Sequence, residues 1–186
     1  NKGVLALMSD STNVEKPGFT PSESSVGPAI MRAVAEATGR VILATFASNV
    51  SRLQQAIDAA VATKRKVVVL GRSMVNVTEI AQERGYLTVP EMNRYRADEI
   101  MILTTGSQGE PMAGLSRMST NNHRTVEITP NDTVIISATP IPGNEAAVGR
   151  TIDNLLRQGA HVVYGKDRGI HVSGHGSQED LKTMLN

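Results

Sequence analysis

A histidine flanked by two glycines stands just before a predicted helix near the end of the chain. His175 lies between Gly174 and Gly176, and Ser177 to Asp180 fits the capping-box pattern that begins a helix. The glycines leave the imidazole unpacked, and a histidine at a positive helix end faces an anion with its N–H groups. His175 could therefore donate a proton to a leaving oxygen or bind a phosphate oxygen, although its context is also that of an ordinary surface turn.

An aspartate occupies a comparable place near the start of the chain. Asp10 follows the apolar run Val4–Met8, a predicted strand, and it can cap the turn of Ser11–Asn13 through its side chain. The same carboxylate can equally orient a histidine or a metal-bound water. Because Asp10 and His175 would both stand at the carboxyl edge of one sheet, their closeness in space is a hypothesis that a structure can test.

The other candidate chemistry lies in short runs of small polar residues that follow further predicted strands. These runs are Ala47–Asn49, Gly71–Ser73, Thr105–Pro111 and Ser137–Asn144. In a parallel sheet they meet at one edge, where open α/β sheets bind ligands, and backbone N–H groups at helix starts suit phosphate. Helix capping explains any one run more simply, but together with Ser9–Asn13 and Ser173–Gln178 they favour a site for a polyanion.

The elements that must position these residues alternate between short apolar runs and helical patterns. Runs suited to buried strands are Val4–Met8, Val41–Phe46, Val67–Leu70, Ile100–Leu103, Val134–Ile136 and His161–Tyr164. Helices are predicted over Ser25–Ala37, from a cap at Asn49, from a cap at Ser73 to Gly85, and from a cap at Asn144 to Gly159. This order predicts a three-layer α/β/α fold with a mainly parallel, Rossmann-like sheet, in a single domain over residues 1–186. His123–Ile128 alternates weakly and is a candidate antiparallel edge strand.

Composition narrows the classes of function. A net charge of +1 among 186 residues gives no bulk attraction to nucleic acid or membrane, so anion binding must come from local arrangement. The chain has no cysteine, which excludes disulfides and thiolate metal sites within it and fits a reducing, cytoplasmic compartment. No apolar run approaches the ~20 residues that span a bilayer, and we expect no membrane partner.

The common nucleotide and metal motifs do not occur in the sequence. There is no G-x-G-x-x-G after the first predicted strand, no P-loop, no H-x-H-x-D-H and no H-E-x-x-H. The absence of the glycine motif argues against a dehydrogenase-like cofactor domain. The absence of the histidine motifs means that no local motif supplies a complete metal site. The chain begins at Asn1 and ends at Asn186 inside a helical pattern, and we interpret it as a piece of a longer protein.

Six segments together resemble a known family, the β-CASP domain of bacterial ribonuclease J within the metallo-β-lactamase superfamily of nucleases. They are SDSTN (9–13), ATFASNVSRLQQAIDAA (44–60), GRSM (71–74), TTGSQGEPMAGLSR (104–117), PIPGNE (140–145) and HVSGHGSQED (171–180). The segments span nearly the whole chain, in order.

The resemblance implies a domain inserted into a metallo-β-lactamase domain that carries two zinc ions, with RNA in the cleft between the two. Asp10 matches the family's first motif and His175 its second. The third motif and the zinc-binding motif do not occur in this sequence, so no metal ligand is expected within it. His175 is then expected to act on the scissile phosphate as proton donor or oxyanion stabiliser. Asp10 would orient groups of the metal site.

The meeting of the polar turns at one edge of the sheet, together with the resemblance, also predicts residues that bind RNA phosphates, including a 5′-monophosphate. These are Ser48, Asn49, Ser107, Gln108, Ser173 and Gly174. The whole protein is expected to cleave RNA both endonucleolytically and 5′→3′ in RNA processing and decay, and to form a homo-oligomer. The isolated chain is expected to be inactive. The alternative is a stand-alone, Rossmann-like module that binds phosphate or nucleotides.

Overall fold

The structure is a computed structural model that describes residues 5–88 and 99–185. The chain divides into two compact units, which are described separately. The larger unit runs from Glu23 to His171, and the smaller unit combines Asn1–Ser22 with Val172–Asn186. The prediction of one domain over residues 1–186 stays a prediction.

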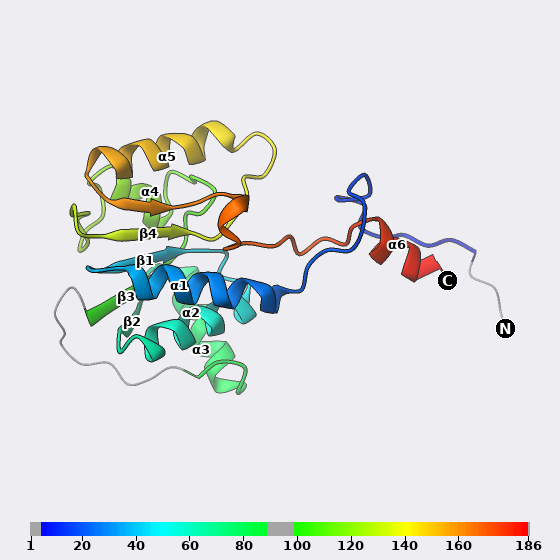
Figure 1. Cartoon of the computed structure of the whole chain (residues 1–186), viewed down its shortest axis with the longest axis horizontal. Coiled ribbons are helices and arrows are strands. Elements are labelled where there is room, and N and C mark those ends of the chain that lie inside the picture. The colour runs from blue at the N-terminus through cyan, green and yellow to red at the C-terminus, as the bar shows by residue number, and fades with distance from the viewer. Residues whose placement is uncertain (1–4, 89–98, 186) are drawn as a thin grey trace. The chain divides into compact units, whose positions relative to one another are not determined.

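A five-stranded parallel sheet forms the centre of the larger unit (Figure 1). Its strands are β1 (Val41–Ala44), β2 (Lys66–Val69), β3 (Ile100–Thr104), β4 (Thr133–Ile136) and β5 (His161–Val163). Their order across the sheet is β2-β3-β1-β4-β5, with Val41 paired to Met101 on one side and to Thr133 on the other. The connections that follow β1 and its neighbour β4 run in opposite directions across the sheet, which makes the carboxyl ends of these two strands a switch point of the kind that binds ligands.

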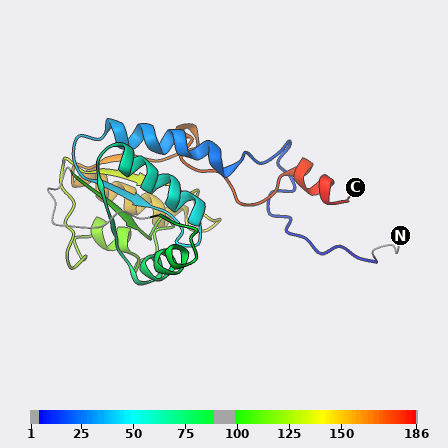
Figure 2. The ribbon, with the colours of Figure 1, turned by 90° about the horizontal axis from the view of Figure 1, so that it is seen from below.

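Helices cover both faces of this sheet, which confirms the predicted three-layer α/β architecture. The helices of the larger unit are α1 (Gly27–Glu36), α2 (Val50–Ala62), α3 (Arg72–Glu83), α4 (Gly114–Ser119) and α5 (Glu145–Arg157), with short 3-10 turns η1 (Glu23–Val26) and η3 (Lys166–Arg168). Helices α1 and α2 pack against each other on one face, while α4 and α5 pack together on the other (Figures 1 and 2).

Side chains that alternate between the two faces of the sheet pack into a separate core on each face. Ile42, Ile102 and Val134 face the side where Leu115 of α4 and Leu155 of α5 complete an aliphatic core. The neighbouring residue on each strand points to the opposite side because strand side chains alternate. All residues of β1 and β4 are buried, as expected for a parallel sheet covered by helices on both faces.

The predicted antiparallel edge strand at His123–Ile128 is wrong. Val126 and Ile128 are buried in the core shared with α4 and α5, so the segment crosses a covered face of the sheet instead of extending its edge. His123 also begins a turn, because its Nδ1 accepts from the backbone N–H of Val126 at 3.2 Å.

Most of the predicted helix boundaries hold, but the starts of two helices move. Helix α1 begins at Gly27, after the 3-10 turn η1, and not at Ser25. Asn49 caps α2, since its side chain accepts from the N–H of Arg52. Gly85 and Gly159 follow α3 and α5 with positive φ, as predicted. Helix α3 begins earlier than predicted: its N-cap is Gly71, and Ser73 lies inside the helix.

In the smaller unit, Val4–Met8 does not supply the expected first strand. Val4 lies outside the described residues, and Leu5–Met8 have no strand geometry, with Leu5 and Met8 almost completely exposed. An apolar run becomes a strand only when a neighbour completes its hydrogen bonds, and the described part of this unit contains no other strand. The unit's one described helix is α6 (Gln178–Leu185).

Candidate functional site

Asp10 and His175, separated by 165 positions in the sequence, meet in the smaller unit. The Nδ1 atom of His175 lies 2.6 Å from Oδ2 of Asp10. Both side chains are about half exposed, at 53% and 48% respectively. A carboxylate and an imidazole at this separation form a charge-assisted hydrogen bond that fixes the orientation of the ring.

Hydrogen bonds keep the Asp10 carboxylate ionised. The side chain and the backbone N–H of Thr12 both donate to Oδ1, at 2.6 and 3.0 Å, and His175 bonds to Oδ2. These contacts, those from Thr12 foremost, lower the pKa of Asp10 to about 2. Because the carboxylate is then an acceptor at neutral pH, Nδ1 of His175 carries the hydrogen and Nε2 is left for another partner.

Buried and half-buried polar side chains hold the backbone of His175 in place. Asn13, which is buried, donates from Nδ2 to the carbonyl oxygen of His175 at 3.0 Å and to Oγ of Ser173 at 2.9 Å. The hydroxyl of Thr20 donates to the same carbonyl at 2.8 Å. Ser173 Oγ in turn accepts from the N–H of His175 at 3.2 Å. The imidazole is therefore presented from a loop whose backbone groups are paired.

The predicted capping box begins α6 directly after this loop. The carboxylate of Asp180 accepts from the N–H of Ser177, the N-terminal residue of the motif, at 2.9 Å, and from the N–H of Thr20 at the same distance. These two backbone hydrogen bonds lower the pKa of Asp180. The start of α6 is thus tied to the segment that follows Asp10.

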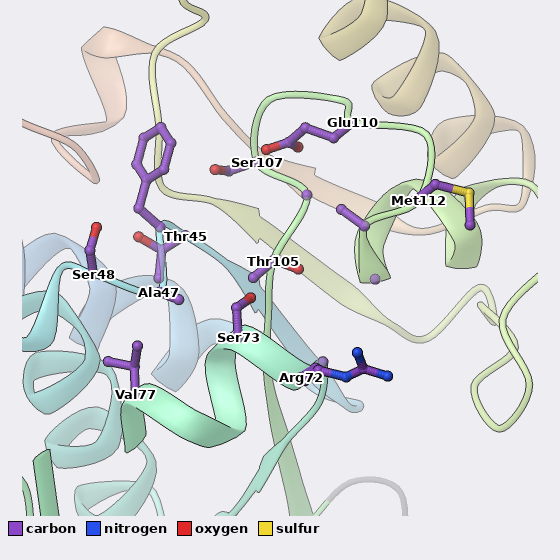
Figure 3. A pocket seen from close by; sticks show the side chains of 15 residues that line it. Thr45, Ala47, Ser48, Arg72, Ser73, Val77, Thr105, Ser107, Glu110 and Met112 are labelled. Atoms are coloured by element: carbon purple, nitrogen blue, oxygen red, sulfur yellow. The ribbon is translucent and has the colours of Figure 1, made fainter. Parts of the chain in front are cut away.

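The larger unit carries a separate feature, a cavity of about 730 Å³ at the carboxyl ends of β1, β2 and β3 (Figure 3). Its walls are the turns predicted to meet at this edge: Thr45–Ser48 after β1, Gly71–Ser73 after β2, and Thr105–Ser107 after β3. Figure 3 shows the hydroxyl-bearing side chains of these turns around one hollow.

The lining of this cavity combines hydrogen-bonding groups with one positive and one negative charge. Thr45 is 1% exposed, and its Oγ1 has no hydrogen-bond partner among the described residues. Arg72 lies at the start of α3 and is exposed, while Glu110 contributes a carboxylate from the turn after β3. Phe46 and Met112 add apolar surface. A buried hydroxyl without an internal partner is the kind of group that a polar ligand satisfies.

The six predicted phosphate-binding residues fall into three groups. Ser48 and Ser107 line the cavity. Asn49 and Gln108 do not line it, because Asn49 caps α2 and the buried amide of Gln108 donates to the Thr139 carbonyl at 2.9 Å and accepts from the Ile141 N–H at 2.8 Å. Gln108 therefore joins the turns after β3 and β4. Ser173 and Gly174 belong to the loop of His175 in the smaller unit.

Some residues of both sites were missed by sequence reasoning. Arg72 and Thr45 stand in or beside polar turns after strands, so their position was a usable signal. Asn13 stands in the polar run Ser9–Asn13, but its contacts, like those of Thr20, gave no signal, because they are made with residues more than 150 positions away.

Comparison with known proteins identifies the larger unit. Residues 38–155 match the family described as Ribonuclease J, beta-CASP domain. The chain belongs to this family. It is 46% identical to Ribonuclease J2 of Bacillus subtilis over its whole length, 50% identical to Ribonuclease J of Synechocystis over 99% of it, and 46% identical to Ribonuclease J of Thermus thermophilus over its whole length. The chain spans only about a third of the length of these relatives, at 35%, 30% and 34%.

Neither a metal site nor a membrane-spanning helix occurs among the described residues. In the ranges 5–88 and 99–185, no three His, Cys, Asp or Glu side chains come together as metal ligands. The Asp10–His175 pair alone does not make a metal centre. Within the same ranges, no helix combines the length and apolar character that crossing a membrane requires.

Proposed function

We propose that this chain is the RNA-binding and catalytic-support part of a ribonuclease of the metallo-β-lactamase type. The observation that carries the proposal is the 2.6 Å contact between His175 and an ionised Asp10, which leaves Nε2 of an exposed imidazole for a substrate. The names of the relatives, all ribonucleases, support the class of reaction.

In this proposal His175 acts on the phosphate through Nε2. The Asp10 carboxylate fixes the tautomer and stabilises the ring when it is positively charged. A protonated Nε2 donates a hydrogen bond to a phosphate oxygen, or passes its proton to the leaving oxygen as the P–O bond breaks. Asp10 is the residue that orients the ring, and it takes no proton itself.

The cavity at the ends of β1, β2 and β3 is proposed to bind a segment of the RNA. Arg72 supplies a positive charge for a phosphate, and the Thr45, Ser48 and Ser107 hydroxyls supply donors. A 5′-monophosphorylated RNA is the proposed substrate, although Glu110 opposes a phosphate placed close to it.

The remaining parts of the proposal concern the whole protein. It would act endonucleolytically and as a 5′→3′ exonuclease in RNA processing and decay, in the cytoplasm, as a homo-oligomer. It would depend on two zinc ions, with ligands from outside the described residues, in the metallo-β-lactamase domain of the same protein. The isolated chain would be inactive, and RNA hydrolysis by the purified chain with Zn²⁺ or Mn²⁺ would contradict this.

The test of the central step is His175→Ala in the full-length protein, with His161→Ala as the matched control. His161 is an exposed histidine at the start of β5 and lies in the larger unit. We expect kcat for RNA cleavage to fall about 10²–10⁴-fold in His175→Ala, with an unchanged circular dichroism spectrum, and to stay at the wild-type value in His161→Ala. Wild-type kcat in His175→Ala would remove its proposed role.

A second candidate function is a phosphate- or nucleotide-binding module without a catalytic role. The observation that favours it is that the cavity is lined entirely by residues of the larger unit. Calorimetry of the isolated chain with a nucleoside monophosphate separates the two functions. Micromolar binding with no loss of RNA cleavage in the His175→Ala full-length protein would favour the module.

A further inference from the structure

A buried arginine connects the two points at which the chain passes between its units. Arg52, in the first turn of α2, has a side chain that is only 1% exposed. Its guanidinium contacts Glu23, the first residue of the larger unit, and His171, the last. The chain passes between the units only next to these two residues, at Ser22–Glu23 and at His171–Val172.

The contact with Glu23 is a two-point ion pair. Arg52 Nε lies 2.7 Å from Oε1 of Glu23, and its NH2 nitrogen lies 2.6 Å from Oε2. The Gln55 amide also donates to the Glu23 backbone carbonyl at 3.2 Å. A guanidinium and a carboxylate in this paired geometry fix direction as well as distance. The first passage of the chain is thereby fastened to α2.

The contact with His171 fastens the second passage to the same side chain. The NH1 nitrogen of Arg52 lies 2.6 Å from Nδ1 of His171 and 3.0 Å from the carbonyl oxygen of Ser137. Because arginine has only donors, Nδ1 must be the acceptor and His171 carries its hydrogen on Nε2. The buried Ser137 hydroxyl donates to the Ile170 carbonyl at 2.5 Å, which fixes the adjoining residue as well.

We propose that Arg52 is a positioning residue that holds both passages of the chain, at Ser22–Glu23 and at His171–Val172, in one fixed arrangement, and so restrains the two segments that lead to Asp10 and His175. Its catalytic consequence rests on the proposed function. Asp10 lies 13 positions before Glu23 and His175 lies four after His171 (23 − 10 and 175 − 171). An ordinary buried ion pair stabilises its own unit, whereas this one also restricts the two segments through which the other unit is attached.

The larger unit offers a matched control in the pair of Arg40 and Asp132. Arg40 also makes a two-point contact, at 3.0 and 2.6 Å, and its side chain is 15% exposed. Neither residue lies at a passage of the chain between the units. Arg40→Met therefore removes a similar pair from the same unit without touching Glu23 or His171.

Hydrogen–deuterium exchange of the full-length protein is the decisive measurement. In Arg52→Met and His171→Leu, we expect amides at residues 19–24 and 170–174 to exchange at least about tenfold faster, because each variant frees a passage of the chain. His171→Asn places an acceptor oxygen near the position of Nδ1, so it should retain wild-type exchange. Arg40→Met should leave both segments protected. If Arg52→Met does not fold, the comparison of exchange rates in His171→Leu and His171→Asn tests the proposal.

Distance measurements provide a second readout of the restraint on these two segments, and this readout does not depend on RNA. Spin labels at Glu83→Cys in α3 and Met184→Cys in α6 report on the two units, and this chain contributes no cysteine of its own. We expect Arg52→Met to broaden the distance distribution and Arg40→Met to leave it unchanged. For cleavage, Arg52→Met should lower kcat more than it changes KM.

The proposal is overturned if Arg52→Met and Arg40→Met give the same exchange pattern and the same label distances, or if His171→Asn behaves like His171→Leu. Failure of the proposed function would look different. In that case the label distances would broaden in Arg52→Met, while His175→Ala would still cleave RNA at the wild-type rate.

Discussion

Two adjacent residues of the turn after β3, Ser107 and Gln108, should respond to mutation in opposite ways. Both were expected from sequence to contact RNA, and both are almost completely buried. Gln108 uses its amide to hold the Thr139 carbonyl and the Ile141 N–H, whereas Ser107 lines the cavity. Replacement of each by alanine therefore separates a residue that supports the fold from one that is available to a ligand.

The expected effect of Gln108→Ala follows from the contacts it removes. Two hydrogen bonds contribute about 1 kcal/mol each, and the loss of packed side-chain volume adds up to about 1 kcal/mol. The free energy of unfolding should then fall by about 2–3 kcal/mol, which lowers Tm by about 4–12 °C for a chain of this size. Ser107→Ala removes one hydroxyl and should change Tm by less than about 2 °C.

Thermal unfolding of the purified chain and RNA-binding titrations of the full-length protein, carried out on both variants, test this reasoning. We expect Gln108→Ala to lower Tm and to bind RNA normally at temperatures where it is folded. Ser107→Ala should keep its Tm and bind RNA several-fold more weakly. The opposite pattern, with a stable Gln108→Ala that no longer binds RNA, would refute the structural role of Gln108.

Three further perturbations follow from the same contacts. The pKa of Asp10 is lowered to about 2 from 3.8, so its contribution to stability should be complete above about pH 4 and be lost as the pH falls to about 2; an NMR titration of the carboxyl carbon checks this, and a midpoint near 3.8 would exclude it. Gly109→Ala should destabilise by more than ~2 kcal/mol in urea unfolding, because φ is +71° and a Cβ would lie 2.5 Å from the backbone of α5, whereas Gly149→Ala within α5 meets nothing within 4 Å and should stabilise by about 0.5–1 kcal/mol. Arg72→Gln should weaken RNA binding and reduce the slope of log K for RNA binding against log salt concentration by about 1. Arg84 is an exposed arginine at the other end of α3, and Arg84→Gln should change neither quantity.

The parallel core of the fold could be predicted because its signals are local. Each of the five strands is a short run rich in apolar residues, and β1 and β4 are completely buried. The longer helices α1, α2, α3 and α5 each carry a helical period of apolar residues. The helix α4 was missed because Gly114–Ser119 is short and follows a turn rich in polar residues. The first predicted strand failed for a different reason: an apolar run shows that burial is favourable, but it does not show which partner would provide it.

The meeting of Asp10 and His175 was accessible to sequence reasoning only as a hypothesis, and the route to it was partly wrong. Both were expected at the rim of one sheet. They meet instead within the smaller unit, through Asn13, Ser173 and Thr20, none of which lies on a strand. The contact forms without the expected strand because Asn13, Thr20 and Ser173 bind the backbone of His175 and hold its loop in place. Hydrogen bonds to backbone groups leave no periodic pattern in the sequence.

The turn after β3 shows why richness in polar residues does not by itself identify a ligand site. Its glycines are required by the backbone, since Gly106 and Gly109 both have positive φ, and a Cβ on Gly109 would lie 2.5 Å from the backbone of α5. The side-chain amide of Gln108 is already hydrogen-bonded to the turn after β4, which it joins to the turn after β3. What remains for a ligand is the set of polar groups that line the cavity and have no internal partner among the described residues, with Thr45 Oγ1 the clearest case. Counting partners, and not polar residues, is therefore the physical criterion that separates a turn built for the fold from a turn built for binding, and a sequence alone does not contain that count.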